Sequence, residues 1–294
     1  MIIWKTIFFY TCYVYRKCVC NIFEIKNPQP RAYLLHAAYL LSKFLPSYAW
    51  QKHATFEELH TVEAKYVIRR NTFDAICASP DYERPDIELT KRLIAEKAEQ
   101  GKSVLYIDIG ANIGCYCIRV ANAFRGWDKL SVIAFEPFPE SFDLLKKNIS
   151  VNDFAENIDA VCAALSEAPG TAPLYISNQD PGSNSLHVHN HTTSAPVLVN
   201  LKRLDDIELV WKKRRTADCV FLKLDCEGAE VSVLKGGEAF LSSIPDVLIM
   251  VEDFVDSGVC HYLTRNQWEC FAKQTPYNSF WRKRGPMPHR YRSP

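Results

Sequence analysis

The sequence lacks an excess of either charge, because 35 Lys and Arg residues are balanced by 34 Asp and Glu residues, for a formal net charge of +1. Proteins that bind nucleic acid over much of their surface usually carry a clear positive excess, so no nucleic-acid partner is expected. Internal repeats and low-complexity tracts are also missing. With 294 residues, of which 48% are hydrophobic, the chain can form one large α/β domain with extensions or two modest domains.

A hydrophobic run long enough to cross a membrane is also missing. The most apolar stretch, residues 1–15, is interrupted by Lys5 and followed by Arg16 and Lys17. A spanning helix needs about 20 apolar residues, and a signal peptide would place its basic residues before the apolar run. Aromatic residues beside basic ones favour two other readings for residues 1–23: peripheral contact with a membrane surface, or a helix packed on the main domain or a partner.

The cysteine content favours a reducing compartment. There are 11 cysteines, an odd number, and no secretory signal accompanies them. Free, mostly buried thiols are the simplest interpretation. We therefore expect a cytoplasmic protein, with attachment at the inner membrane face as an addition if residues 1–23 bind lipid.

The first 82 residues predict a helical and hairpin extension. A breaker cluster at residues 27–30 is followed by helical spacing over residues 31–45. Residues 65–69 and 72–77 predict two short strands around a turn.

A helix is expected over residues 86–100, closed by Gly101.

From residue 103 the pattern changes to strands alternating with helices. Apolar strands are predicted at 104–109, 130–135, 158–164, 220–224 and 247–251. Helices are expected up to residue 124, over 139–148 and near 229–235, with a β excursion at 171–177 and 197–201. Nearly continuous apolar strands alternating with helices predict an α/β fold with a mostly parallel sheet covered on both faces. We assign this domain to residues 83–254.

The end of the chain does not continue this pattern. Residues 267–273 look helical, only 279–282 suggest a strand, and 282–294 are basic and contain proline. The prediction for residues 255–294 is therefore an irregular segment.

A glycine turn follows the first strand of the α/β domain. Asp108 ends the strand, Gly110 and Gly114 frame the turn, and Asn112 stands where a dinucleotide-binding turn would carry its middle glycine. No Gly-Lys-Ser/Thr ending is present either, so a ligand without phosphates fits better. Gly110 can allow close approach of a cofactor, Gly114 can allow tight helix packing, and Asp108 can meet an ammonium group.

Glu136 ends the second strand, where a carboxylate commonly binds both hydroxyls of a ribose. An ordinary strand-terminal acid is the alternative. Together with the glycine turn, the position favours ribose binding.

Several segments in order resemble the FkbM family of S-adenosylmethionine (SAM)-dependent methyltransferases. The resemblance covers about residues 82–254, and its segments are Asp108–Gly114, Phe135–Pro137, Ala164–Ser166, Gly182–Leu186, Leu204–Asp206, Lys223–Glu230, Val233–Gly236 and the strand ending in Glu252. It implies a class I, Rossmann-like fold with a seven-stranded, mostly parallel sheet. It also implies SAM as cofactor and O-methylation of a sugar or natural-product hydroxyl.

The resemblance also implies roles for individual residues. Asp108 and Gly110 would face the methionine part of the cofactor, in a turn completed by Asn112 and Gly114. Glu136 would bind the ribose, and Ala164 and Leu165 would lie near the adenine. The family's last strands have no clear counterpart here, which motivates one alternative: a module that binds SAM without catalysis. A nicotinamide-dependent dehydrogenase is a less favoured alternative.

Three acids after the fourth predicted strand are the catalytic candidates, because that strand end borders the cofactor crevice. Asp225 is the preferred base or metal ligand, and Glu227 can orient substrate or bind a cation. Glu230 is either catalytic or simply an acid in the first turn of a helix. Glu252, at the end of the fifth strand, is a weaker candidate of the same kind.

Two further groups favour ordinary structural interpretations. His187, His189 and His191 alternate along an extended segment, but no fourth ligand is evident, so a solvated loop is favoured over a metal site. One of them can still act as a base. The basic run at residues 212–215 predicts a solvated helix end, with binding of an anionic substrate as the alternative. We assign no metal.

Overall fold

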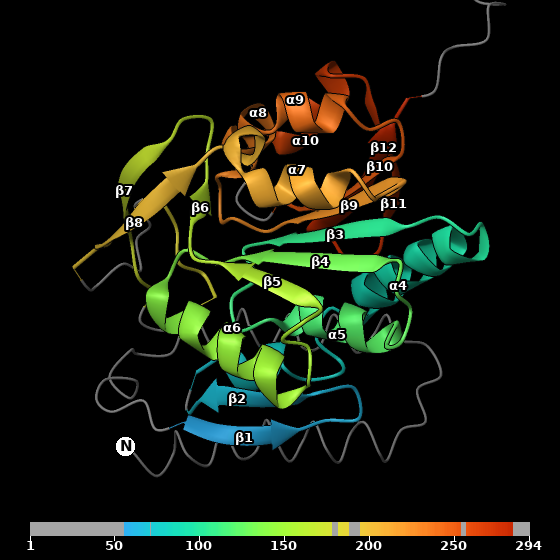
Figure 1. Cartoon of the computed structure of the whole chain (residues 1–294). Coiled ribbons are helices and arrows are strands. Elements are labelled where there is room, and N and C mark those ends of the chain that lie inside the picture. The colour runs from blue at the N-terminus through green and yellow to red at the C-terminus, as the bar shows by residue number, and fades with distance from the viewer. Residues whose placement is uncertain (1–55, 71, 178–181, 188–194, 254–256, 285–294) are drawn as a thin grey trace, which may run out of the picture.

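A seven-stranded sheet forms the centre of the chain in the computed structural model, which describes residues 56–70, 72–177, 182–187, 195–253 and 257–284 (Figure 1). Its strand order is β11-β12-β10-β9-β3-β4-β5. The strands are β3 (Val104–Ile109), β4 (Leu130–Phe135), β5 (Ile158–Val161), β9 (Cys219–Leu224), β10 (Val247–Glu252), β11 (Trp268–Lys273) and β12 (Asn278–Lys283).

The strands from β10 to β5 are parallel, and their order reverses beside β3. The chain runs outward from β3 through β4 to β5, then returns to place β9 on the other side of β3. Every residue of β3 and β9 is buried. In such open sheets a crevice forms at the carboxyl ends of the strands where the order reverses, so the fold places a binding site between β3, β4 and β9.

Helices cover both faces of the sheet, as the sequence predicts. On one face lie α4 (Arg84–Glu99), α5 (Cys115–Ala123) and α6 (Pro139–Val151). On the other lie α7 (Glu208–Arg214), α8 (Glu230–Gly236), α9 (Glu238–Ser242) and α10 (Val259–Arg265), which Figure 1 shows above the sheet. Alternate residues of the strands enter two separate hydrophobic clusters, one under each helical layer. This is a Rossmann-like α/β fold.

A smaller sheet follows β5. Its strands are β6 (Ala164–Leu165), β7 (Gly170–Leu174) and β8 (Val197–Lys202), in the order β6-β8-β7. The predicted excursion is therefore confirmed, but the predicted strand at 158–164 divides, since β5 ends at Val161 and Ala164 pairs with β8. A short 3-10 helix, Leu204–Asp206, leads from β8 toward α7.

The N-terminal hairpin packs against the helical layer below the sheet. β1 (Phe56–His60) pairs with β2 (Lys65–Arg69), and both lie beneath α5 and α6 in Figure 1. Asn148 of α6 accepts a hydrogen bond from the backbone N–H of Val67 (2.6 Å) and donates one to its carbonyl (3.2 Å). Asn152 does the same with Lys65 (2.9 and 2.6 Å). The two asparagines thus satisfy the backbone of β2 as a neighbouring strand would.

The second predicted strand of this region is wrong. Residues 72–77 contain a short helix, α3 (Asp74–Cys77). The carboxylate of Asp74 accepts hydrogen bonds from the backbone N–H and the guanidinium of Arg69 (2.8–3.0 Å). This local pairing turns the chain back directly after β2 and prevents a third extended segment.

The prediction of an irregular segment over residues 255–294 is also wrong for the part that the structure describes. Residues 267–273, expected to be helical, form β11, and β12 inserts between β10 and β11 as an antiparallel strand. A register shift between Cys270 and Ala272 breaks the alternation of side chains along β11. The sequence therefore lacks the period-two pattern that predicts a strand. The sheet therefore extends beyond the predicted boundary at residue 254.

The predictions for residues 1–23 and 31–45 lie outside the described residues. Within the described ranges, the helices are too short or too polar to cross a bilayer.

Candidate functional site

The glycine turn after β3 adopts the backbone geometry that its sequence predicts. Gly110 and Gly114 have positive φ values of 81° and 93°, and Asn112 lies in the left-handed region at 48°. A Cβ on Gly110 would lie 1.8 Å from the backbone carbonyl oxygen of Asp225. The closest approach at Gly110 therefore comes from the loop after β9, and glycine lets this loop lie against the turn. A Cβ on Gly114 would meet side chains of α5 and α6 at 2.8 Å, in line with its expected packing role.

Glu136 lies directly after β4 and is 6% exposed. Its Oε2 accepts a hydrogen bond from the N–H of Asn112 (2.8 Å), and its Oε1 accepts one from the N–H of Phe138 (2.8 Å). Burial raises the pKa of this carboxyl to about 7, although both backbone donors oppose the shift. The two N–H groups fix the orientation of the carboxylate and leave each oxygen with capacity for a further hydrogen bond.

A pocket opens at the carboxyl ends of β3, β4 and β9. It encloses about 560 Å³ of empty space, a volume that includes space open to solvent. The predicted site residues that line it are Gly110, Asn112, Glu136, Ala164, Leu165, Asp225 and Glu227. The structure brings these residues together from four different segments. Asp108, Gly114 and Glu230 do not line this pocket.

Asp108 lies below the pocket and pairs with an ammonium group of the protein itself. It is fully buried; its Oδ2 accepts a hydrogen bond from the N–H of Cys117 (3.0 Å), and its Oδ1 lies 3.3 Å from Nζ of Lys223. Burial raises the pKa of Asp108, against the opposing effect of Lys223. The sequence predicts that Asp108 contacts the ammonium group of a cofactor. In the structure Asp108 pairs instead with the ammonium group of Lys223 and does not line the pocket.

Lys223 is a site residue that the sequence reasoning did not single out. Its Nζ donates to Oδ2 of Asp225 (2.9 Å) and to the carbonyl of Gly110 (3.2 Å), in addition to its contact with Asp108. Burial disfavours the charged amine, but the two carboxylates raise the pKa of Lys223 well above its usual value. A lysine in an otherwise apolar buried strand needs a buried partner, and this signal could have identified it.

Asp225 and Glu252 form a hydrogen-bonded carboxyl pair at the ends of β9 and β10. Burial acts to raise the pKa of Asp225, yet Lys223 and the hydrogen bond from Glu252 hold it below its ordinary value. Burial and the charge of Asp225 raise the pKa of Glu252 well above its usual range. The opposite directions of the two shifts favour a proton on Glu252 and the ionised form of Asp225.

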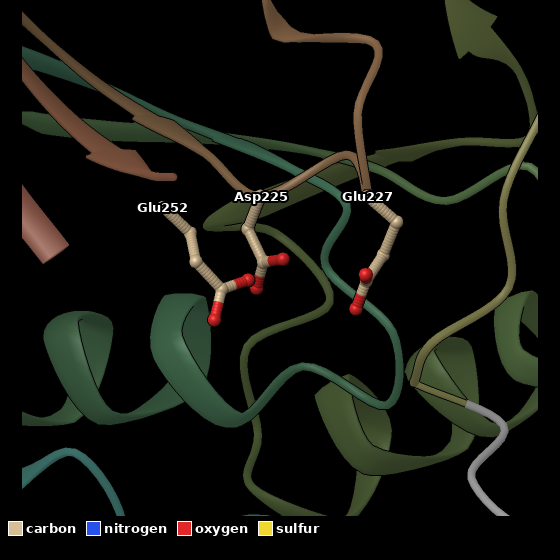
Figure 2. A group of neighbouring side chains, drawn as sticks. All are labelled: Asp225, Glu227 and Glu252. Atoms are coloured by element: carbon tan, nitrogen blue, oxygen red, sulfur yellow. The ribbon is translucent and has the colours of Figure 1, made fainter. Parts of the chain in front are cut away.

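Glu227 completes this acidic group, and Figure 2 shows the three carboxyl groups converging on one region. One oxygen of each lies within 4.8 Å of the others. Acidic groups of this kind are common without a bound ion, and the hydrogen bond between Asp225 and Glu252 already explains the approach of two of the three.

Glu230 supports the loop rather than facing the pocket. It is the first residue of α8, 2% exposed, and its Oε1 accepts hydrogen bonds from the N–H groups of Cys226 (2.9 Å) and Gly228 (3.1 Å). Of the two predicted roles, this arrangement matches the acid in a helical first turn.

The segment 182–187 forms another wall of the pocket through Gly182, Asn184 and Leu186. Ser185 donates a hydrogen bond from its hydroxyl to the carbonyl of Glu227 (2.7 Å), which ties this wall to the loop after β9. His187 is exposed, and His189 and His191 lie outside the described residues.

The N-terminal side contributes a further buried acid, which sequence reasoning missed. Glu83, 7% exposed, accepts a hydrogen bond from the hydroxyl of Tyr116 (2.5 Å). Burial, with the nearby charges of Asp86 and Asp225, raises the pKa of Glu83 to about 8. The ring of Tyr116 lies 4.9 Å from Nζ of Lys223, so both residues border the acidic group.

The basic run at residues 212–215 does not face the pocket. It ends α7, just before β9 begins, whereas the pocket lies at the other end of β9, roughly 17–20 Å away for a strand of this length. Lys213 pairs with Asp159 (2.9 Å), and Arg214 donates to the carbonyls of Ala217 and Ser243 (both 2.9 Å). These contacts support the prediction of an ordinary helix end.

Comparison with known proteins connects this geometry to a family. Residues 108–265 match the family described as Methyltransferase FkbM domain. The chain is 30% identical over 155 residues to Methyltransferase sdnD of Sordaria araneosa (44% of this chain, 59% of that protein). It is 33% identical over 176 residues to Hexuronic acid methyltransferase AglP of Haloferax volcanii (56% and 62%). The matches thus span about three-fifths of each relative's length.

Solved structures are more distant. The SAM-dependent methyltransferase from Agrobacterium tumefaciens matches with 10% identity and a TM-score of 0.37, covering 70% of this chain and 55% of that one. At such a score the fold of the present chain is established by its own strand order and layers.

Proposed function

The chain belongs to the FkbM methyltransferase family, and we propose that it is a SAM-dependent O-methyltransferase that acts on a hydroxyl of a sugar or natural product. One observation carries the proposal: the carboxylate of Glu136 is fixed by two backbone N–H groups at the edge of the pocket, and both its oxygens can still accept hydrogen bonds. Two acceptor atoms held side by side suit the two hydroxyls of a ribose.

The rest of the pocket fits an adenosyl group. Ala163, Ala164, Leu165 and Leu174 form an apolar wall beside Glu136, suitable for a purine ring. By the strand order, Gly110 and Asp225 lie on the other side of Glu136, which supports an orientation with the methionine end of the cofactor toward the acidic group. When bound, SAM supplies an electrophilic methyl group on a sulfonium.

Asp225 can orient the acceptor and receive its proton. Because Lys223 keeps Asp225 ionised, the carboxylate can accept a hydrogen bond from the acceptor hydroxyl. Its lowered pKa makes it a weak base for a free alcohol. The hydroxyl becomes acidic only as its oxygen bonds to carbon, so the proton moves to Asp225 late, and alignment of the reacting atoms supplies most of the rate.

An acceptor with several hydroxyls fits this chemistry. Carboxylates are acceptors for hydroxyl protons, and Asp225 and Glu227 both line the pocket. One relative, from Haloferax volcanii, is named for methylation of a hexuronic acid, which supports a sugar as the general class. That sugar is an acid, and its charge is a property of the relative's acceptor that is not carried over to this chain.

Calorimetry with SAM tests the proposal on the full chain. We expect saturable binding, a loss of at least about tenfold in affinity for Glu136→Ala because the ribose loses its acceptors, and little change for Glu156→Gln, an exposed glutamate remote from the pocket. NADH should give no binding. Absence of heat with SAM from a folded protein would refute the proposal, whereas binding without transfer to any acceptor would favour the module without catalysis.

The pH dependence provides a second check on Glu136. Its pKa of about 7 means that the ionised form, which accepts both ribose hydroxyls, is lost as the pH falls through neutrality. Affinity for SAM should therefore rise between pH 6 and pH 8, and Glu136→Gln should flatten this rise. An affinity in the wild-type protein that falls over this range would contradict the assigned role.

A further inference from the structure

The acceptor side of the pocket is acidic. Asp225 and Glu227 line it, and Glu252 lies beside Asp225 at the end of the neighbouring strand (Figure 2). Glu83 adds a fourth carboxyl from the N-terminal side and influences both Asp225 and Glu252. The chain thus brings acids from three separate segments to one end of the cavity.

The positive charge at this site is already engaged. Nζ of Lys223 donates hydrogen bonds to Asp225 (2.9 Å) and to the carbonyl of Gly110 (3.2 Å), and it lies 3.3 Å from Oδ1 of Asp108. Even before Glu227 and Glu252 are considered, two carboxylates face one ammonium group. The lysine is 3% exposed, and these contacts already engage its charge.

The pKa of Glu252 indicates how this environment affects an additional negative charge. Burial and the charges of Asp225 and Glu227 raise this pKa well above the ordinary value, so this end of the pocket disfavours a further negative charge beside those of Asp225 and Glu227. A carboxylate or phosphate on a substrate would meet the same desolvation and the same repulsion, without the means to protonate as easily.

We propose that this methyltransferase selects uncharged or cationic hydroxyl acceptors, such as neutral or amino sugars, and rejects anionic ones, because Asp225 and Glu227 line the acceptor end of its pocket while Lys223 is fully engaged. The inference depends on the proposed function and adds the charge class of its acceptor. Neutral polyols gain hydrogen bonds from these carboxylates, and an ammonium group gains an ion pair.

Two basic groups among the described residues are not available to an anion at this end of the pocket. The basic residues 212–215 lie at the other end of β9. Arg69, which donates a hydrogen bond to Asn112 of the glycine turn (3.3 Å), is 2% exposed and is also held by Asp74 and Ser141.

Three matched probes test this without knowledge of the natural acceptor. Each is a SAM analogue in which a tertiary amine replaces the sulfonium and carries a third arm: 3-hydroxypropyl, 2-carboxyethyl or 3-aminopropyl. The arm takes the place of the methyl group and extends toward the acceptor side in the proposed binding mode, and the three arms are similar in length. Calorimetry on the full chain at pH 7.5 therefore compares arms that differ mainly in charge. We expect the carboxylate probe to bind at least about tenfold more weakly than the hydroxyl probe, and the ammonium probe at least as tightly.

Variants connect the effect to the acidic wall. Glu227→Gln should narrow the ratio between the carboxylate and hydroxyl probes, and Glu156→Gln should leave it unchanged. A carboxylate probe that binds as tightly as the hydroxyl probe, or a ratio unaffected by Glu227→Gln, would overturn the inference. Failure of SAM and all three probes to bind would instead refute the proposed function itself.

Discussion

Lys223 is the residue on which the arrangement of the site most depends. It joins the acid beneath the pocket, Asp108, to the acid that lines it, Asp225, and does so from a fully buried strand. Removing one partner of a buried ion pair leaves an uncompensated charge, which typically costs about 3–5 kcal/mol. We expect Lys223→Met to lose stability in this range in urea unfolding at pH 7.

The matched comparison is Lys235→Met. Lys235 is 46% exposed and pairs with Glu167 at 3.2 Å, a surface contact of the kind that contributes less than about 1 kcal/mol. Equal stability of the two variants would show that Lys223 does not hold the buried acids together.

Gly110 offers a second prediction for a single residue. Gly110→Ala places a methyl group 1.8 Å from the carbonyl of Asp225, at a φ of 81° that already disfavours side chains. Gly101 has a similar φ of 73° but open space around it, so Gly101→Ala should cost only the backbone term of about 1–2 kcal/mol. Thermal unfolding should show the larger loss for Gly110→Ala, together with weakened SAM binding. Similar losses of stability for Gly110→Ala and Gly101→Ala would mean that the loop after β9 does not lie in close contact with the turn at Gly110.

Among the elements, the C-terminal hairpin completes the sheet. Phe280 in β12 is 1% exposed and belongs to the same hydrophobic cluster as the residues beneath β3 and β9. Phe280→Ala should therefore cost about 3–5 kcal/mol in urea unfolding, as for other large core residues. Leu198→Ala, at a position 74% exposed, should stay within about 0.5 kcal/mol of the wild type. A small effect at Phe280 would indicate that the hairpin is dispensable.

The elements also show which parts of the structure the sequence could predict. Strands β3 and β4 match the expected 104–109 and 130–135 because central strands of a parallel sheet carry a nearly continuous apolar run. The hairpin was missed because a bulge in β11 disrupts its alternation, and α3 was missed because a local ion pair, Arg69 with Asp74, overrides the strand pattern.

The sequence predicts only some of the site residues, for a related reason. Glu136 and Asp225 follow strands, where acids in this fold type bind ligands, so their positions were predictable. Glu83 was not, because its importance arises from contacts between segments far apart in the chain. Lys223 could have been singled out as a lysine in an apolar strand, but its contacts with Asp108 and Gly110 could not have been predicted. Spacing along a sequence carries no direct signal of such contacts.

On the scale of the whole molecule, the hairpin of β1 and β2 belongs to the same folding unit as the sheet. Ile68 is fully buried and shares a hydrophobic cluster with residues of α5, α6 and β12. Ile68→Ala should cost about 2–5 kcal/mol and shift the unfolding transitions measured by circular dichroism and by tryptophan fluorescence together. If only one of these two unfolding transitions shifted, the hairpin would unfold independently of the sheet, as its assignment to a separate N-terminal extension implies.

The most direct test of the account is a crystal structure of the full chain with S-adenosylhomocysteine. We predict that the ribose hydroxyls lie within hydrogen-bond distance of both Glu136 carboxylate oxygens, with the adenine against Ala164 and Leu165. A nucleoside bound elsewhere, or a pocket without ligand at saturating concentration, would contradict it.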